Sequence, residues 1–326
     1  MPHDPARIAA IAIGRNEGER LGRCLASLAG QAGRLIYVDS GSTDGSLAVA
    51  RAAGAEVVEL DLTTPFTAAR ARNAGFEALR HGGLPDYVQF VDGDCEIQPD
   101  WIAAATAFLD ARPGAVVACG RRRERFPDAS IYNRFCDLEW DTPVGEALAC
   151  GGDALMRASA FDAAGGFDPA VIAGEEPELC VRLRAAGGQV WRLDREMTLH
   201  DAAMTRFGQW WKRTRRAGHA NAEGYAMHGW RPERHGRSGT LRPLFWTLVL
   251  PLAAIGLGMS LHPAGFLLLL AWPVQIVRMA LRDGGSGTAW ASAFFIMLGK
   301  IPEVLGVLEY AAGRLTRRPS QIIEYK

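Results

Sequence analysis

The sequence lacks the motifs that mark several large classes of protein. It contains no Gly-x-x-x-x-Gly-Lys-Ser/Thr and no Gly-x-Gly-x-x-Gly, which argues against a P-loop kinase and an ordinary dinucleotide dehydrogenase. Its six cysteines form no Cys-x-x-Cys and have no nearby histidines, which favours free thiols in a reducing compartment over a disulfide framework or a zinc site. Because 36 Lys and Arg balance 36 Asp and Glu, the net charge indicates no nucleic-acid partner. We expect no signal peptide, since charged residues come early and no long apolar core follows.

One long stretch lacks charge altogether. Residues 243–277 contain no Asp, Glu, Lys or Arg, and a helix needs about 20 mostly apolar residues to cross a bilayer. Residues 243–261 and 264–280 therefore predict a transmembrane helical hairpin. Basic residues flank both of its ends, which places both flanks on the cytoplasmic side by the positive-inside rule. The alternative for the hairpin is the buried core of a larger soluble fold or of a dimer.

A third apolar segment begins at residues 289–298 but is interrupted by Lys300, Pro302 and Glu303. If it spanned the membrane, the arginines that follow it would lie outside, against the positive-inside rule. An amphipathic interfacial or re-entrant helix is therefore favoured, with three full spans as the second choice. Before the hairpin, residues 207–216 mix aromatic and cationic side chains, which suits a helix at a membrane interface. The alternative there is a helix packed on the N-terminal domain with its cations solvated.

The N-terminal part alternates between predicted strands and predicted helices. Residues 8–13 are a continuous apolar run of strand length, typical of a parallel strand buried on both faces. Segments with helical spacing of apolar residues separate further predicted strands at residues 35–38, 57–60, 88–91, 115–119 and 190–193. This alternation predicts an α/β domain with a mainly parallel sheet flanked by helices. Residues 121–149 are mixed in charge and are expected to be irregular.

Two carboxylates follow the predicted strand 88–91, in the order Asp92-Gly93-Asp94. Ligands of open α/β sheets bind at the carboxyl ends of strands, and Gly93 lets the backbone turn sharply there. Two carboxylates so close repel each other, so their charge must be offset. A hard divalent cation that also holds phosphate oxygens is the natural candidate. The alternative is a polar turn whose aspartates cap the helix that begins near residues 99–101.

A second polar loop, residues 39–46, follows the predicted strand 35–38 and is rich in Ser, Asp and Gly. One interpretation is that Asp39 accepts a hydrogen bond from a base or a ribose at the strand end. As a bare pattern, the loop is better explained as a well-capped helix start.

An ordered set of motifs resembles the family 2 glycosyltransferases. The set comprises Asn16-Glu17, the stretch 38–45, Ala71-Arg72-Asn73-Ala74-Gly75, Asp92-Gly93-Asp94, Gly151-Gly152 with Arg157, the stretch 165–168, and the stretch 174–183 that contains Glu175-Glu176. The resemblance covers roughly residues 8–215. It implies a GT-A fold, a nucleotide-sugar donor, a divalent metal (Mn²⁺ or Mg²⁺) and inversion at the anomeric carbon.

The resemblance also implies roles for particular residues. Asp39 would bind the nucleobase, and Arg72 and Asn73 would shape the nucleotide pocket. Asp92 would lie near the ribose and the metal, and Asp94 would be a direct metal ligand. A UDP-sugar is favoured as donor over a GDP-sugar.

The resemblance places the catalytic base at Glu176, where the family usually has the Asp of a Glu-Asp pair. A glutamate can do the same chemistry when its carboxylate comes within about 3 Å of the acceptor hydroxyl. Its longer side chain changes the geometry, so Glu175 remains open as the base. The alternative is a helix start whose acidic residues complement the helix dipole. His200, at the end of a predicted strand, could complete the metal or diphosphate site, or it could be a structural histidine.

Together these features predict a metal-dependent inverting glycosyltransferase at the cytoplasmic membrane, with its catalytic domain facing the cytoplasm and a lipid-linked or glycan acceptor. The alternatives are a non-catalytic nucleotide-sugar-binding or scaffold subunit of an envelope polysaccharide assembly and, ranked last, a nucleotidyltransferase. The expected division is a GT-A domain at 1–205, an interfacial helix and linker at 206–242, a transmembrane hairpin at 243–282, and an amphipathic or re-entrant helix with a basic tail at 283–326.

Overall fold

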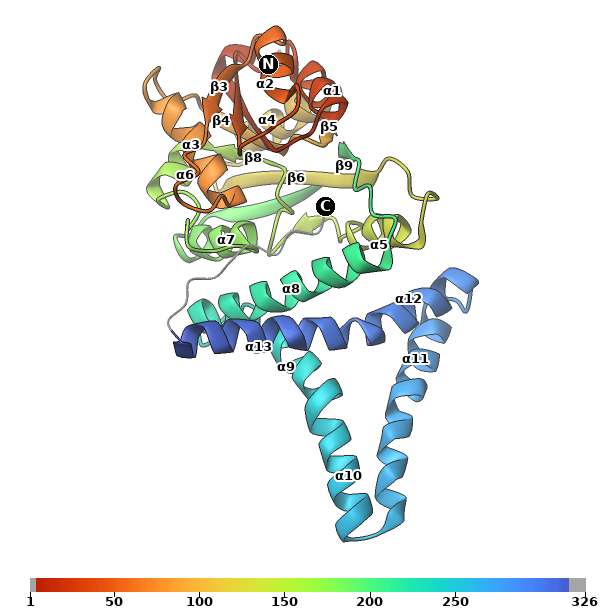
Figure 1. The fold of residues 1–326 in the computed structure, drawn as a ribbon. Coiled ribbons are helices and arrows are strands. Elements are labelled where there is room, and N and C mark those ends of the chain that lie inside the picture. Colours follow the sequence, from red (N-terminus) through yellow and green to blue (C-terminus); the bar gives the residue numbers. More distant parts are fainter. Residues whose placement is uncertain (1–3, 317–326) are drawn as a thin grey trace. The chain divides into compact units, whose positions relative to one another are not determined.

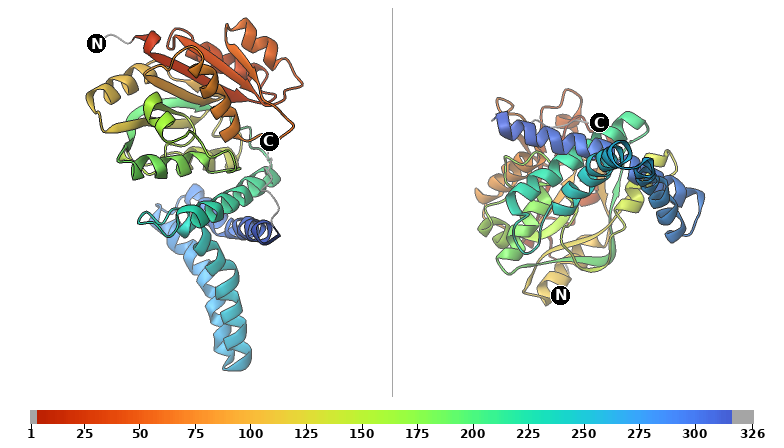
Figure 2. Two further views of the ribbon diagram at one scale, coloured as in Figure 1. Left: turned by 90° about the vertical axis from the view of Figure 1, so that its left-hand side faces the viewer. Right: turned by 90° about the horizontal axis from the view of Figure 1, so that it is seen from below.

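The computed structural model describes residues 4–316 and divides into two compact units, Met1–Thr205 and Arg206–Lys326. The last part of the expected basic tail, residues 317–326, lies outside the described residues. Figures 1 and 2 show the N-terminal unit in red to green and the C-terminal unit in green-cyan to blue. Each unit is described below by itself.

The first half of the N-terminal unit is a parallel sheet. Its strands β1 (Ile8–Gly14), β2 (Arg34–Asp39), β3 (Glu56–Glu59) and β4 (Tyr87–Asp92) lie in the order β3-β2-β1-β4. The connections contain α1 (Glu19–Leu28), α2 (Ser46–Ala52) and α3 (Ala68–Arg80). The central strands β1 and β4 are buried along almost their whole length, as their apolar runs predicted.

The second half of the sheet is mixed. It continues from β4 through β8 (Ala154–Arg157), β6 (Ala115–Glu124), β9 (Gln189–His200) and β5 (Cys95–Ile97), and β7 (Gly145–Glu146) pairs with β9. β8 runs antiparallel to both of its neighbours, whereas β6 and β9 run parallel. The helices of this half are α4 (Trp101–Ala111), α5 (Ile131–Glu139), α6 (Ala158–Ala163) and α7 (Glu175–Ala185).

The prediction that residues 121–149 are irregular was wrong for three parts of the segment, the end of β6, helix α5 and the short strand β7. β6 continues to Glu124, and helix α5 follows, with the Ser130 hydroxyl accepting a hydrogen bond from the Asn133 N–H at its start. The residues that α5 buries include Asn133 and Asp137. Because this buried face is largely polar, a search for apolar periodicity does not detect the helix.

The one polar residue inside strand β4, Gln89, is fully buried and satisfied. Its Oε1 accepts a hydrogen bond from the Trp101 indole N–H at 2.9 Å, and its amide group donates to the Phe90 carbonyl at 2.7 Å. An unpaired buried amide would destabilise the sheet, so these bonds allow the polar interruption. They also fix α4 against β4, directly before Asp92-Gly93-Asp94.

The C-terminal unit is helical throughout its described part. Its helices are α8 (Phe207–His228), α9 (Arg237–Leu244), a π-helical turn (Phe245–Val249), α10 (Leu250–Ser260), a 3-10 segment (Pro263–Leu270), α11 (Ala271–Arg282), α12 (Gly287–Leu298) and α13 (Lys300–Thr316). Within residues 4–316, three helical stretches are long and apolar enough to cross a membrane: Arg237–Ser260, Pro263–Arg282 and Gly287–Thr316. The first two form a hairpin in Figure 1, and many of its large side chains are exposed, including Leu252, Met259 and Leu267.

Helix α13 packs along the cationic helix α8, as both figures show. A Cβ atom placed on Gly218 would lie 2.0 Å from the Glu303 carbonyl oxygen, and one on Gly306 would lie 2.0 Å from the Arg215 carbonyl oxygen. Only glycine allows the two backbones to approach this closely. The Arg215 guanidinium forms an ion pair with Glu309 of α13 at 2.8 Å. Lys300, Pro302 and Glu303, which interrupt the third apolar segment, therefore lie on α13, and α13 is ion-paired with the cationic helix α8.

Candidate active site

The carboxyl ends of β4 and β9 hold three of the predicted site residues, Asp92, Asp94 and His200. Asp92 ends β4, and Asp94 leads into β5, which pairs with the end of β9 so that Cys95 lies opposite His200. This register places the Asp94 carboxylate beside the His200 ring, although 105 residues separate them in the sequence. The sequence therefore predicted that these residues lie at strand ends. The antiparallel pairing of β5 with β9 determines which of them become neighbours.

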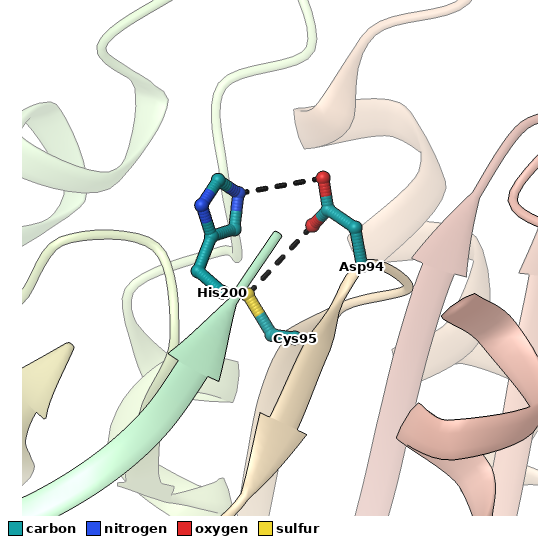
Figure 3. A group of neighbouring side chains, drawn as sticks. All are labelled: Asp94, Cys95 and His200. Carbon is teal, nitrogen blue, oxygen red and sulfur yellow. Dashed lines mark hydrogen bonds and ion pairs between the residues drawn. The ribbon is translucent and has the colours of Figure 1, made fainter. Parts of the chain in front are cut away.

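The first corner of the site consists of Asp94 and His200, both buried. Figure 3 shows the His200 ring facing the Asp94 carboxylate, with Nε2 3.3 Å from Oδ2. The other ring nitrogen, Nδ1, lies 3.6 Å from the Glu124 carboxylate and is buried without a hydrogen-bond partner among residues 4–316. The Trp140 ring packs edge-on against His200, at a centroid distance of 4.7 Å. The imidazole is thus oriented with one nitrogen toward each of two carboxylates.

The second corner is built around Arg72 of helix α3, which is 2% exposed. Its guanidinium contacts Asp92 Oδ1 at 2.7 Å and Glu175 Oε1 at 2.6 Å. Burial alone would lower the pKa of Arg72, but the charges of Asp92 and Glu175 outweigh it and raise the pKa. Arg72 therefore stays charged and joins α3, the end of β4 and the start of α7.

Two residues that the sequence reasoning missed complete this second corner. Asp153, fully buried, accepts hydrogen bonds from the Asp92 backbone N–H at 3.0 Å and from the Thr198 hydroxyl at 3.0 Å. Arg122 forms an ion pair with Asp153 at 2.6 Å and lies 3.5 Å from Asp92 Oδ2. Their only signals in the sequence are an aspartate after Gly151-Gly152 and the middle member of an arginine triplet.

The explanation of Asp92 and Asp94 as helix caps is wrong. The N-cap residue of α4 is Asp100, which lies six residues beyond Asp94 and makes no side-chain cap hydrogen bond. Asp92 instead contacts two guanidinium groups, and Asp94 faces an imidazole. Arg72 and Arg122 also offset charge on Asp92 within the protein, and the role of Asp92 near a ribose and a cation stays a prediction.

The two predicted base residues begin helix α7 and have different partners. Glu175 is paired with Arg72, as described above. The Oε1 atom of Glu176 accepts a hydrogen bond from the Cys150 backbone N–H and lies 3.1 Å from the Cys180 sulfur. Among residues 4–316, these neutral groups are the hydrogen-bond partners of Glu176, and all of them use Oε1. The Oε2 atom of Glu176 takes part in neither of these two bonds.

Asp39 and Asn73 make contacts of a different kind. The Asp39 carboxylate accepts hydrogen bonds from the Gly41 and Ser42 N–H groups at 2.9 and 2.8 Å, and from the Tyr37 hydroxyl at 3.0 Å. The N-cap residue of α2 is Gly45, and the Asp44 carboxylate before it accepts a hydrogen bond from the Ser46 N–H at 2.9 Å; hydrogen bonds with Ser46 lower the pKa of Asp44. Asn73 exchanges two hydrogen bonds with the Phe167 backbone. Asp39 orders its own loop and Asn73 fixes the 165–168 turn, so their parts in a nucleotide pocket stay predictions.

The first corner has the donor chemistry of a divalent-cation site. A carboxylate and an imidazole together suit Mn²⁺, and a histidine ligand is usually oriented by a carboxylate on its other nitrogen. Glu124 lies on that side of His200, and the unpaired Nδ1 faces it. Cys95 also borders the corner, with its sulfur 3.7 Å from Asp94 Oδ1 in Figure 3, but burial raises the pKa of this thiol and keeps it protonated.

Comparisons with known proteins give a family model that matches part of the chain, relatives of part of the chain, and a common fold. The sequence profile of Glycosyl transferase family 2 matches residues 11–161. A TPR repeat-containing protein of Synechococcus elongatus is 37% identical over 138 residues, 42% of this chain and 32% of that protein. Succinoglycan biosynthesis protein ExoA of Rhizobium meliloti is 28% identical over 174 residues, 50% of this chain and 52% of that protein. The chain thus spans about half or less of the length of these relatives.

A solved structure extends the likeness to almost the whole chain. The mannosyltransferase PcManGT from Pyrobaculum calidifontis, solved in complex with GDP-Man and Mn²⁺, has a TM-score of 0.64 and a sequence identity of 17%. The alignment covers 94% of this chain and 90% of that one. At this identity the likeness establishes a common fold and leaves the chemistry to be argued from the residues.

Proposed function

The chain carries a glycosyl transferase family 2 domain with a GT-A fold, and on this premise we propose that it transfers a sugar from a nucleotide-sugar donor to an acceptor hydroxyl, with inversion, at a divalent-cation site. The observation that carries the proposal is the Asp94 carboxylate facing His200 Nε2 at 3.3 Å, at the carboxyl edge of the sheet. The mannosyltransferase of the same fold was solved with GDP-Man and Mn²⁺, which supports both the donor class and the cation.

Asp94 and His200 would hold the cation, Mn²⁺ or Mg²⁺, with Glu124 orienting the imidazole. When bound, such a cation neutralises charge on a diphosphate leaving group as a Lewis acid. Asp92, held by Arg72 and Arg122, would lie beside the ribose and the cation, and Asp39 would bind the nucleobase. Arg72 keeps Asp92 and Glu175 in fixed positions, so the pocket does not have to reorganise when the donor binds.

Glu176 would be the catalytic base. The Oε1 atom of Glu176 is held by the Cys150 N–H, which leaves Oε2 to remove the proton from the acceptor hydroxyl as that hydroxyl attacks the anomeric carbon. Glu175 is a weaker candidate, because its Oε1 lies 2.6 Å from the Arg72 guanidinium and its carboxylate belongs to the framework of the site. We therefore assign Glu175 a positioning role.

The acceptor would be a lipid-linked or envelope glycan, because the chain carries helices long and apolar enough to cross a membrane. The hairpin formed by α10 and α11 would span the cytoplasmic membrane, with both flanks and the catalytic domain on the cytoplasmic side. Helix α13, with its ion pair to α8, would lie at the interface, since charged residues deep in a bilayer are costly.

The test is donor turnover by the detergent-purified protein. A panel of UDP- and GDP-sugars is supplied with Mn²⁺ or Mg²⁺ and membrane lipid extract, beside Asp94→Asn and Glu176→Gln. We expect cation-dependent release of nucleoside diphosphate from one donor, strongly reduced in both variants. Donor binding without turnover would favour a scaffold subunit. Release of pyrophosphate from a sugar phosphate and a nucleoside triphosphate would identify a nucleotidyltransferase.

A further inference from the structure

Two thiols lie against the proposed base. All six cysteines are buried and lie outside any disulfide, and two of them, Cys150 and Cys180, have their sulfur atoms 3.9 Å apart. The Cys180 sulfur is 3.1 Å from Glu176 Oε1. The two sulfurs and a Glu176 carboxylate oxygen all lie within 4.8 Å of one another. Glu176 and Cys180 are one helical turn apart on α7, while Cys150 comes from the loop between β7 and β8.

We propose that Cys150, Cys180 and Glu176 form a second metal site, which takes a thiophilic divalent cation of the Zn²⁺ or Cd²⁺ class. Two thiolates on a tetrahedral zinc ion are about 3.8 Å apart, given Zn–S bonds of about 2.3 Å. The observed separation of 3.9 Å needs almost no movement of either sulfur. The fourth position would be open to water, as at zinc sites that are not purely structural.

The charge balance of the cluster also favours the binding of a divalent cation. The cluster consists of two cysteine thiols and one glutamate side chain. Binding of one divalent cation releases two protons to solvent and forms two metal–thiolate bonds. The total charge within the cluster is then the same before and after binding, so no extra charge becomes buried.

The two metal sites would select different cations. The Asp94–His200 corner offers oxygen and nitrogen, which suit Mn²⁺, whereas the second site offers two sulfurs, which suit zinc and softer ions. A cation held through Glu176 would occupy the carboxylate that removes the acceptor proton. On the proposed function, thiophilic cations would therefore inhibit transfer at the base, without displacing Mn²⁺ from Asp94.

The test is a Cd²⁺ titration of the reduced, detergent-solubilised full chain in metal-free buffer, followed by the ultraviolet thiolate-to-cadmium charge-transfer absorption. Wild-type protein should bind one Cd²⁺ with two thiolates. Cys150→Ser and Cys180→Ser should each weaken binding at least about tenfold, because even the loss of an outer-shell partner commonly has that effect. Cys136→Ser, which removes a buried thiol of α5 outside the cluster, is the matched control and should bind like wild type.

Two outcomes would overturn the site. One is the absence of the absorption band in reduced wild-type protein. The other is a band that persists in the Cys150→Ser/Cys180→Ser double variant but disappears in Cys95→Ser, which would place the cation at Asp94 and His200. Cys150→Ala and Cys180→Ala repeat the test if the serine variants fail to fold, as judged by thermal unfolding. Because this readout needs no activity, its failure is separate from failure of the proposed function, which the donor panel measures.

Discussion

Asp92 and Asp94 leave the same strand end with one glycine between them, but their surroundings differ. Asp92 lies between the guanidinium groups of Arg72 and Arg122, so its charge is offset by the protein itself. Asp94 faces His200, which is a cation only when protonated. We infer that the Asp92 corner is a framework that is complete in the folded protein, whereas the Asp94 corner is available to an exchangeable cation. The adjacent glutamates repeat this contrast, since Glu175 is paired with Arg72 and Glu176 is held by neutral groups.

The largest expected effect tests the contrast between Glu175 and Glu176. Glu176→Gln should lower kcat about 10²- to 10⁴-fold, the usual contribution of a general base, while donor affinity is retained. Glu175→Gln is the matched control and should act mainly on thermal stability, because it removes a partner of Arg72. Steady-state kinetics and donor binding measure the first effect. A larger fall in kcat for Glu175→Gln than for Glu176→Gln would assign the base to Glu175.

The next effect tests whether the Asp92 corner is a framework. Arg72→Met keeps much of the side-chain volume but leaves Asp92 and Glu175 without their shared cation, so the free energy of unfolding should fall by about 3–5 kcal/mol. The nearly isosteric substitution Asp94→Asn should change the free energy of unfolding by less than about 1 kcal/mol. Denaturant unfolding of the two variants decides the point. Equal destabilisation by both would remove the distinction between the corners.

A smaller effect, on Mn²⁺ affinity, is expected for Glu124, whose carboxylate faces His200 Nδ1. Glu124→Gln weakens the carboxylate that faces Nδ1, and Mn²⁺ affinity should fall about tenfold, the lower end for outer-shell partners of a metal ligand. Glu178→Gln is the control, because Glu178 is a buried acid that forms its ion pair with Arg182 on α7. Calorimetric Mn²⁺ binding compares the two variants. Unchanged affinity in Glu124→Gln would show that Glu124 does not orient the imidazole.

The smallest effect concerns a carboxylate that is paired but partly exposed. Hydrogen bonds from Arg7 and then Tyr87 lower the pKa of Asp110 to about 2. Since the folded-state pKa lies below the unfolded one, Asp110 stabilises the fold above about pH 4, and this contribution is lost as the pH falls toward 2. Its side chain is 40% exposed, so Asp110→Asn should cost less than about 1 kcal/mol at pH 7. The measurement is denaturant unfolding of wild type and Asp110→Asn over a series of pH values. A loss of stability in Asp110→Asn that persists at pH 2 would contradict this assignment.

The sequence predicted the elements whose signal is local. The apolar runs of β1 and β4 gave the parallel half of the sheet, and the carboxylates that follow β4 gave the edge where the site lies. Helix α5 was missed because it buries Asn133 and Asp137. Arg122 and Asp153 were missed for another reason, since arginine in a basic triplet usually indicates a solvated surface. Only the pairing of β6 with β8, which are distant in the sequence, brings Arg122 and Asp153 together beside Asp92.

We infer that Asp94, and not Asp92, binds the exchangeable cation. The most direct measurement is Mn²⁺ binding by electron paramagnetic resonance, in the presence of nucleoside diphosphate, to wild type, Asp94→Asn and Asp92→Asn, with thermal unfolding of each protein. Asp94→Asn should lose at least about tenfold in Mn²⁺ affinity with little change in stability. Asp92→Asn should lose stability with the smaller change in affinity. The reverse pattern, with affinity lost in Asp92→Asn and retained in Asp94→Asn, would contradict the account.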